Sequence, residues 1–123
     1  MNIPICHLYG LEESRCDTMK KAGTWLRNSG IEYELHDFKK TGVDEAMLGT
    51  WIDHIGWETL INRRGMTWRK VPQDIKDTIN QTSAIALMLD TPSIIKRPVL
   101  VFSDQITVGF TPEEYASIFK KDT

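Results

Sequence analysis

The chain has 123 residues, a formal net charge of −2, 41% hydrophobic residues and 26% charged residues. This length fits one domain with its own core, and the slight acidity gives no general reason to expect a nucleic-acid partner. No stretch approaches the roughly 18 apolar residues of a membrane span, and the start of the chain, MNIPICHLYG, lacks the features of a signal peptide. We therefore expect a cytoplasmic protein with no membrane partner and no direct contact with nucleic acid.

The amino-terminal third predicts a strand, a helix and a second strand. Residues 3–9, IPICHLY, are almost continuously apolar, which is typical of a strand buried on both faces. After a polar loop, apolar residues recur at helical spacing from Met19 onwards, and Gly30 can end this helix. Residues 31–38 alternate between apolar and polar, as in a half-buried strand. Such a unit is expected to form a right-handed parallel crossover.

The middle of the chain predicts helices. Asp44 can cap a helix that ends at Gly56, and residues 57–62, WETLIN, can add another turn or two. Residues 72–79 and 82–90 predict two shorter helices, the first with a proline at a permitted first-turn position.

The last third predicts two strands and a helix. Residues 98–103 and 106–109 are strand-like, and the SDQ segment between them is too short for a crossover, so they form an antiparallel hairpin. Thr111 can cap the final helix, and Pro112 suits its first position.

The predicted order, β-α-β, a helical block and β-β-α, is that of an α/β, thioredoxin-like mixed sheet with a helical insertion. We expect a single domain over residues 1–123. Its thioredoxin-like core comprises residues 1–38 and 93–123, and the helical insertion comprises residues 39–92.

Cys16 stands where the first helix begins, after a loop at the carboxyl edge of the sheet, the edge where ligands bind in α/β proteins. The unpaired amides and partial positive charge of a helix start favour a reactive thiolate. Arg15 supports that charge, whereas Glu12 and Glu13 oppose it. The competing interpretation is an inert thiol that packs as a small apolar residue, and position alone leaves both open.

The other chemistry-bearing residues show no site pattern. Cys6 lies within the first apolar strand, where a packing role is expected, and it could resolve a disulfide with Cys16 only if the two side chains met. Two cysteines are too few for a disulfide framework. The three histidines, His7, His36 and His54, share no spacing with the cysteines, so we expect no metal site.

Four segments together resemble the arsenate-reductase-like family, the group of ArsC, Spx and YffB proteins. They are CDTMKKAGTWL, IEYELHDFKKTGVD, GWETLINRRGMTWRK and PSIIKRPVLVF. The likeness runs nearly end to end and is greatest for the YffB branch. It implies a thioredoxin-type fold with a helical insertion, in agreement with the order of elements above.

The resemblance also implies site residues. In the arsenate reductases of this family a cysteine attacks the substrate, arginines hold the anion, and glutathione with glutaredoxin completes turnover. Cys16 matches the nucleophile. Arg97 matches the arginine of the RP motif, and Pro98 the proline that family structures hold in cis. Arg64 matches an arginine of the insertion, although Arg63 competes for that role because the register of NRRG is ambiguous.

Three departures from the family pattern bear on function. The segment VGFTPEEY lacks the further arginine of arsenate reductases, and Met19 stands where Spx has the second cysteine of its redox switch. The LEESR segment between Gly10 and Cys16 is longer than is usual in the YffB branch.

The leading hypothesis is therefore a glutathione-dependent thiol reductase with no bound cofactor and with glutathione as cosubstrate. Cys16 would attack a small oxidised substrate, either a disulfide or other oxidised thiol, or an oxyanion. Thr18 and nearby backbone amides would stabilise the charge that develops around Cys16. Arg97 and Arg64 would bind anionic groups. For Arg97 the alternative is a surface salt bridge, and for Arg63 and Arg64 a solvated loop.

Two other functions compete with the first. One is an arsenate reductase coupled to glutaredoxin. The other is a non-enzymatic regulator that binds RNA polymerase, as the resemblance to Spx implies, with the basic NRRGMTWRK segment as part of its surface.

Overall fold

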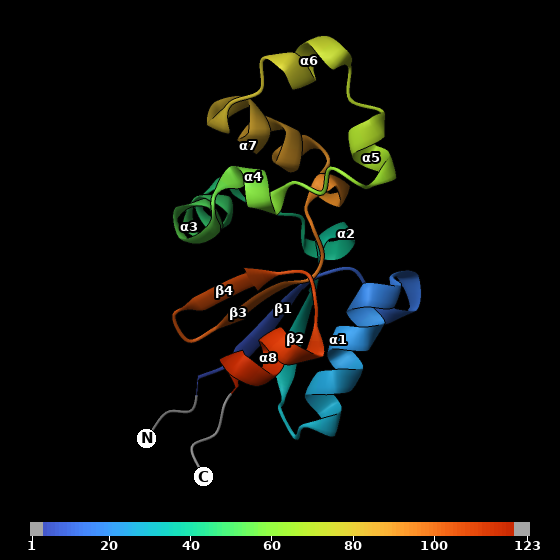
Figure 1. Cartoon of the computed structure of the whole chain (residues 1–123), viewed down its shortest axis with the longest axis vertical. Helices are drawn as coiled ribbons and strands as arrows, with labels where there is room; N and C mark the ends of the chain where they lie inside the picture. Colours follow the sequence, from blue (N-terminus) through green and yellow to red (C-terminus); the bar gives the residue numbers. More distant parts are fainter. Residues whose placement is uncertain (1–3, 120–123) are drawn as a thin grey trace. The chain divides into compact units, whose positions relative to one another are not determined.

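The computed structural model describes residues 4–119, and the chain divides into two compact units (Figure 1). The first unit comprises Met1–Lys40 and Arg97–Thr123, and the second comprises Thr41–Lys96. These boundaries lie slightly later than the predicted ones, and Arg97 belongs to the first unit in both divisions. Within residues 4–119, none of the helices has the length and apolar character needed to span a bilayer.

The first unit contains a four-stranded mixed sheet with the strand order β2-β1-β3-β4. The strands are β1 (Cys6–Gly10), β2 (Tyr33–Asp37), β3 (Val99–Phe102) and β4 (Gln105–Val108). β1 pairs in parallel with β2 and antiparallel with β3, and β3 pairs antiparallel with β4. The thioredoxin-like mixed sheet predicted from the sequence is therefore confirmed, including its carboxy-terminal hairpin.

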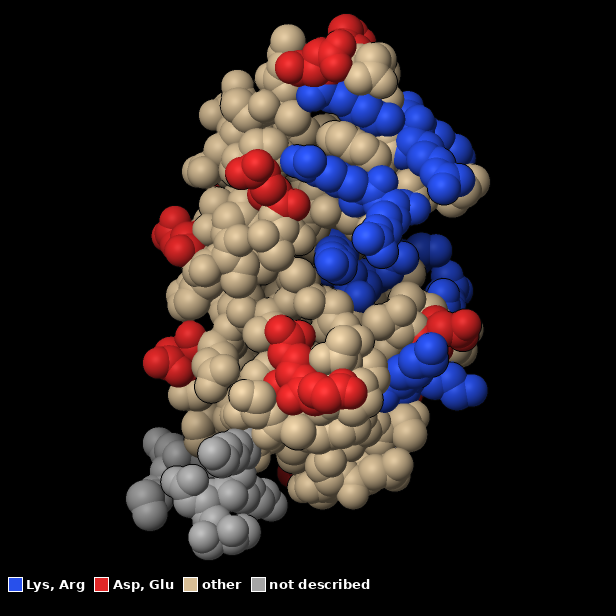
Figure 2. Space-filling view, in the orientation of Figure 1, with Lys and Arg blue, Asp and Glu red and all other residues tan. Residues whose placement is uncertain are grey.

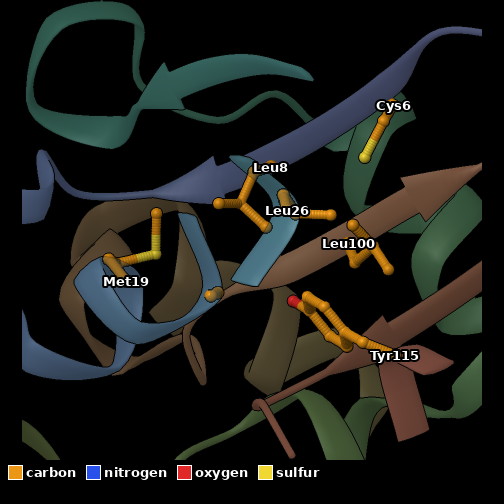
Figure 3. Packing of buried hydrophobic residues seen from close by; sticks show 7 residues of the cluster. Cys6, Leu8, Met19, Leu26, Leu100 and Tyr115 are labelled. Carbon is orange, nitrogen blue, oxygen red and sulfur yellow. The ribbon is translucent and has the colours of Figure 1, made fainter. Parts of the chain in front are cut away.

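One face of this sheet packs against two helices, α1 (Asp17–Asn28) and α8 (Pro112–Ile118), around a shared hydrophobic core (Figure 3). The buried members of that core are Cys6, Leu8, Met19, Ala22, Leu26, Leu100 and Tyr115. Truncating a side chain as fully buried as Leu8 to alanine would cost about 2–5 kcal/mol of stability.

The first strand differs from its prediction. Although its sequence is nearly all apolar, β1 is buried on the core side only: Cys6 and Leu8 face the core, whereas His7 and Tyr9 point to the opposite face and are half-buried. The pleat of a strand places successive side chains on opposite faces, so the mildly polar His7 and Tyr9 occupy the more exposed one.

Two helix starts match the predicted caps. The Asp44 carboxylate accepts a hydrogen bond of 2.7 Å from the Met47 amide at the start of α3 (Glu45–Ile55), and Gly56 ends that helix with a φ of 85°. The Thr111 hydroxyl accepts a 3.1 Å bond from the Glu114 amide at the start of α8.

Helices and turns make up the second unit. After α2 (Phe38–Thr41) and α3 come α4 (Trp57–Leu60), α5 (Met66–Arg69), α6 (Gln73–Asp77), α7 (Gln81–Asp90) and a 3-10 turn, Pro92–Ile94. α3, α4 and α7 contact one another, and an isolated β-bridge joins Ile61 to Ile95. Buried residues of these elements include Leu48, Trp51, Leu60, Ala84 and Met88.

The helices of the insertion differ from their predictions in several details. Pro72 precedes α6 as its N-cap instead of lying in its first turn, and α6 ends at Asp77. α7 begins one residue earlier than predicted, because Asn80 and Ser83 form a reciprocal capping box. The single turn of α5 was not predicted.

Candidate functional site

Cys16 is the N-cap residue of α1, with an extended backbone (φ −152°, ψ 116°). Its carbonyl accepts the first hydrogen bond of the helix, 3.0 Å from the Lys20 amide. The amides of Asp17, Thr18 and Met19 therefore precede the first helical hydrogen bond, and the Cys16 side chain does not cap them. Cys16 stands at the positive end of a twelve-residue helix, where it is partly exposed and also packs against the hydrophobic core of the first unit.

The two acidic residues of the preceding loop are both paired with cations. Glu12 forms a 2.6 Å ion pair with Lys40, which holds the pKa of its carboxyl below the ordinary value. Glu13 accepts a 2.9 Å hydrogen bond from Arg27 and another from the Tyr33 hydroxyl, and its pKa is also lowered, chiefly by Arg27. The charges expected to oppose a thiolate are thus compensated by Lys40 and Arg27.

The same contacts fix the long loop against the rest of the first unit. Because Gly23 of α1 has no side chain, the Glu13 carboxylate and the Tyr33 hydroxyl can lie against the helix at this position. A Cβ atom at Gly23 would overlap the Glu13 carboxylate and lie 2.6 Å from the Tyr33 hydroxyl oxygen. The loop therefore folds back along α1 and is bonded both to this helix and to the start of β2. Its additional length is accommodated in an ordered structure that leads directly into Cys16.

The stem of Arg97 lies beside Gly10, at the end of β1. A Cβ atom at position 10 would be 2.6 Å from the Met19 sulfur and 3.4 Å from Cγ of Arg97, so the stem of Arg97 and Met19 meet at Gly10, the last residue of β1. The Arg97–Pro98 peptide bond is cis, and Pro98 is fully buried at the start of β3. Arg97 and Pro98 therefore lie in the first unit together with Cys16 and Thr18.

Arg63 and Arg64 belong to the second unit. The guanidinium of Arg63 lies over the ring of Trp68, 5.8 Å from its centroid, and the Lys76 ammonium lies 5.2 Å from the same centroid. Arg64 has an exposed side chain, and its amide donates a 3.1 Å bond to the Asn62 side chain. On the face shown in Figure 2, Lys and Arg side chains gather on the side of the insertion where α5 lies.

Unlike the partly exposed Cys16, Cys6 is buried. It is 1% exposed on the core side of β1, and burial raises its pKa to about 11. At neutral pH it is a protonated thiol without access to solvent. The packing role predicted for Cys6 is confirmed.

An apolar groove lies at the other end of the sheet. Its lining includes Pro4, Ile5, Ile31, Tyr33, Phe102 and Phe119. β1 runs from this end, at Cys6, to Gly10 and the loop that precedes Cys16, so the groove and the cysteine mark opposite ends of the strand.

Sequence reasoning missed a cluster on the exposed face of the sheet. His7 of β1 converges with Glu34 and His36 of β2. The signal in the sequence is a glutamate and a histidine two residues apart on one predicted strand, with a histidine on a neighbouring strand. Only the strand register, which pairs His7 with Glu34, brings the three together.

Comparison with known proteins identifies related chains. Residues 11–118 match the model of the ArsC family. The solved structure of a YffB protein is similar with a TM-score of 0.86 and 45% identity, over 91% of this chain and 96% of that one. An arsenate reductase (ArsC) related protein from Brucella melitensis gives a TM-score of 0.76 and 44% identity, over 95% and 96% of the two chains.

Two protein sequences extend the comparison. An uncharacterized protein of Haemophilus influenzae is 35% identical over 112 residues, which is 91% of this chain and 96% of the relative. The regulatory protein MgsR of Bacillus subtilis is 26% identical, over 88% of this chain and 86% of the relative. The similar proteins thus include a regulator as well as a reductase-related protein.

Proposed function

This chain belongs to the ArsC family, and on that premise we propose that it is a glutathione-dependent thiol reductase whose nucleophile is Cys16. The observation that carries the proposal is the contrast between its two cysteines. Cys16 is partly exposed at the start of α1, while Cys6 is buried and protonated. A protein with one accessible thiol must pass its intermediate to an external thiol, and glutathione is the small thiol proposed here.

The chemistry is two successive thiol–disulfide exchanges. The Cys16 thiolate attacks the glutathione sulfur of a substrate–glutathione disulfide; a bond forms between Cys16 and glutathione, and the substrate leaves as a thiolate. A second glutathione thiolate then attacks the glutathione sulfur of this mixed disulfide. Oxidised glutathione is released and the Cys16 thiolate is restored. The net reaction consumes one glutathione thiolate and converts the substrate–glutathione disulfide into the substrate thiolate and oxidised glutathione.

The surrounding groups suit this reaction. The amides at the start of α1 and the Thr18 hydroxyl stabilise negative charge on the Cys16 sulfur. Arg97, whose side-chain stem lies beside Gly10 at the end of β1, supplies a guanidinium for a glutathione carboxylate in this proposal. For the insertion, we propose Arg64 over Arg63 as the anion-binding residue, because the Arg63 guanidinium is engaged with Trp68.

Regulatory binding is the second candidate, and the similarity to MgsR favours it. In this alternative the fold presents a surface to RNA polymerase and Cys16 has no catalytic task. Arsenate reduction coupled to glutaredoxin is a third candidate, because it uses the same nucleophile and the likeness extends to an arsenate reductase related protein.

Mass spectrometry of the chain after mixing with oxidised glutathione tests the first step. We expect a single glutathione adduct, located on Cys16. Cys16→Ser should abolish both this adduct and glutathione-dependent reduction of a small mixed disulfide, while Cys6→Ala should retain both. Full reductase activity in Cys16→Ser, or no adduct on Cys16, would refute the proposal. Glutaredoxin-dependent reduction of arsenate in the absence of disulfide reduction would favour the third candidate instead.

Arginine variants test anion binding. Arg97→Gln should raise KM for the glutathione disulfide more than it lowers kcat, because the guanidinium binds a part of the substrate remote from the exchanged bond. Arg64→Gln should act in the same direction, whereas Arg63→Gln, its neighbour, serves as the matched control. Equal effects of Arg63→Gln and Arg64→Gln would contradict the assignment of Arg64.

A further inference from the structure

Three side chains with metal-binding atoms converge on the sheet face opposite the α1–α8 core. His7 of β1 lies directly across from Glu34 of β2, and His36 lies two residues further along β2, on the same side of the strand as Glu34. Nδ1 of His7 is 2.9 Å from Nε2 of His36 and 3.3 Å from a carboxylate oxygen of Glu34. The same oxygen is 4.0 Å from Nε2 of His36.

These separations match those of ligands around one small cation. Zinc binds histidine nitrogen and carboxylate oxygen at about 2.0–2.2 Å, so two ligands at the tetrahedral angle lie about 3.3–3.5 Å apart. The three separations in the cluster, from 2.9 to 4.0 Å, bracket that value. A zinc ion could therefore be accommodated with side-chain adjustments of a few tenths of an ångström and no movement of the strands.

The site is built on rigid backbone and open on one side. Both histidines come from adjacent, hydrogen-bonded parallel strands, and the ring of Tyr9 stacks on that of His36 with centroids 4.4 Å apart and an angle of 15° between the planes. This stacking fixes the orientation of the His36 ring. The His7 and His36 side chains are 27% and 30% exposed, whereas Glu34 is 58% exposed, which leaves room for water as a fourth ligand.

We propose that His7, Glu34 and His36 form a binding site for a divalent transition metal, with zinc as the fitting ion. Two imidazoles and one carboxylate are a ligand set that zinc uses in proteins with three side-chain ligands and an open position. A neutral imidazole has one lone pair, so His7 carries its proton on Nε2 in the bound form and presents Nδ1 to the metal. The bound ion joins β1 to β2 and stabilises the folded chain.

Calorimetric titration of Zn²⁺ into the full chain tests this site. The titration uses a Cys16→Ser background, because a partly exposed thiol is itself a potential zinc ligand, whereas Cys6 is buried. We expect one zinc ion per chain and a higher melting temperature when zinc is present. His7→Asn, Glu34→Gln and His36→Gln should each weaken binding by at least about tenfold, the loss typical of disturbing even an outer-shell partner.

His54 provides the matched control, since it is a histidine of α3 in the other unit. His54→Gln should bind zinc as tightly as the Cys16→Ser parent does. In NMR spectra, zinc should shift the imidazole ring signals of His7 and His36 but not those of His54. The proposal is overturned if zinc does not bind, or if His36→Gln folds normally and binds zinc as tightly as the parent. Neither result bears on the chemistry proposed for Cys16, which is tested without zinc.

Discussion

The hydroxyl group of Tyr33 donates a hydrogen bond to the carboxylate of Glu13, twenty residues earlier in the chain. Arg27 donates to both partners, at 2.9 Å to Glu13 and 2.7 Å to the Tyr33 oxygen. The three residues connect the loop before Cys16, the last turn of α1 and the start of β2. The position of Cys16 in the first unit thus depends on a polar network at the other end of its own helix.

Removing the Tyr33 hydroxyl should weaken this network. Tyr33→Phe is expected to lower the free energy of unfolding by about 1 kcal/mol, because the partly buried Glu13 carboxylate loses one of its two donors. Urea denaturation at neutral pH measures the change. A Tyr33→Phe protein with the stability of the parent would show that the hydrogen bond contributes nothing.

The same substitution at Tyr115 should have the opposite effect. Tyr115 is 0% exposed, and its buried hydroxyl has no hydrogen-bond partner among residues 4–119. Tyr115→Phe removes a desolvated polar group and keeps the ring contacts with Trp25 and Phe110, so we expect a gain of about 1 kcal/mol. Compared in one urea series, the two Tyr→Phe variants should change the free energy of unfolding in opposite directions. A loss of stability in Tyr115→Phe would contradict the unpaired state of its hydroxyl.

Two helical glycines should respond differently to alanine. Alanine is favoured over glycine in a helix interior by about 1 kcal/mol. Gly49 of α3 faces open space, so Gly49→Ala is expected to gain up to that amount. At Gly23 the added Cβ overlaps the Glu13 carboxylate, so Gly23→Ala should lose stability instead. Thermal unfolding of both variants measures the difference, and an equal gain at both positions would exclude the close contact with Glu13.

The Glu13 contacts also predict a dependence of stability on pH. Arg27 and Tyr33 lower the pKa of Glu13 in the folded chain below the unfolded value of about 4.3. The contribution of the ionised Glu13 carboxylate to the free energy of unfolding is therefore fully present above about pH 4.3. It is lost as the pH falls through the pKa of Glu13 in the folded chain. The stability difference between the parent and Glu13→Gln should be largest near neutral pH and should shrink in acid.

The exposed Glu32 supplies the control for this experiment. Glu32→Gln should change the free energy of unfolding little, since an exposed carboxylate contributes little to stability. If the stability difference between the parent and Glu13→Gln stays constant down to strongly acidic pH, the ionisation of Glu13 does not stabilise the folded chain.

Local chemistry made much of the fold predictable. The caps at Asp44 and Thr111 were predicted because a short polar side chain before an apolar stripe satisfies an amide of the first turn, and both hydrogen bonds are present. The hairpin of β3 and β4 followed from the length of its connection. The single turn of α5 was missed because four residues carry too little periodicity to stand out from a loop.

The arrangement of side chains across elements was less predictable. The sequence places Glu13 near Cys16, whereas its partners Arg27 and Tyr33 lie more than a dozen residues away along the chain. Likewise, the meeting of His7 with His36 depends on the register of β1 against β2, which no local pattern specifies.

The reactivity of the Cys16 thiol is the most direct test of the proposed function. The full chain is alkylated briefly with iodoacetamide at neutral pH, in the native state and in urea, and each cysteine is quantified by peptide mass spectrometry. We expect Cys16 to react faster in the native protein than in the unfolded one, and Cys6 to react only after unfolding, because it is 1% exposed. Slower alkylation of Cys16 in the native protein would contradict an activated nucleophile.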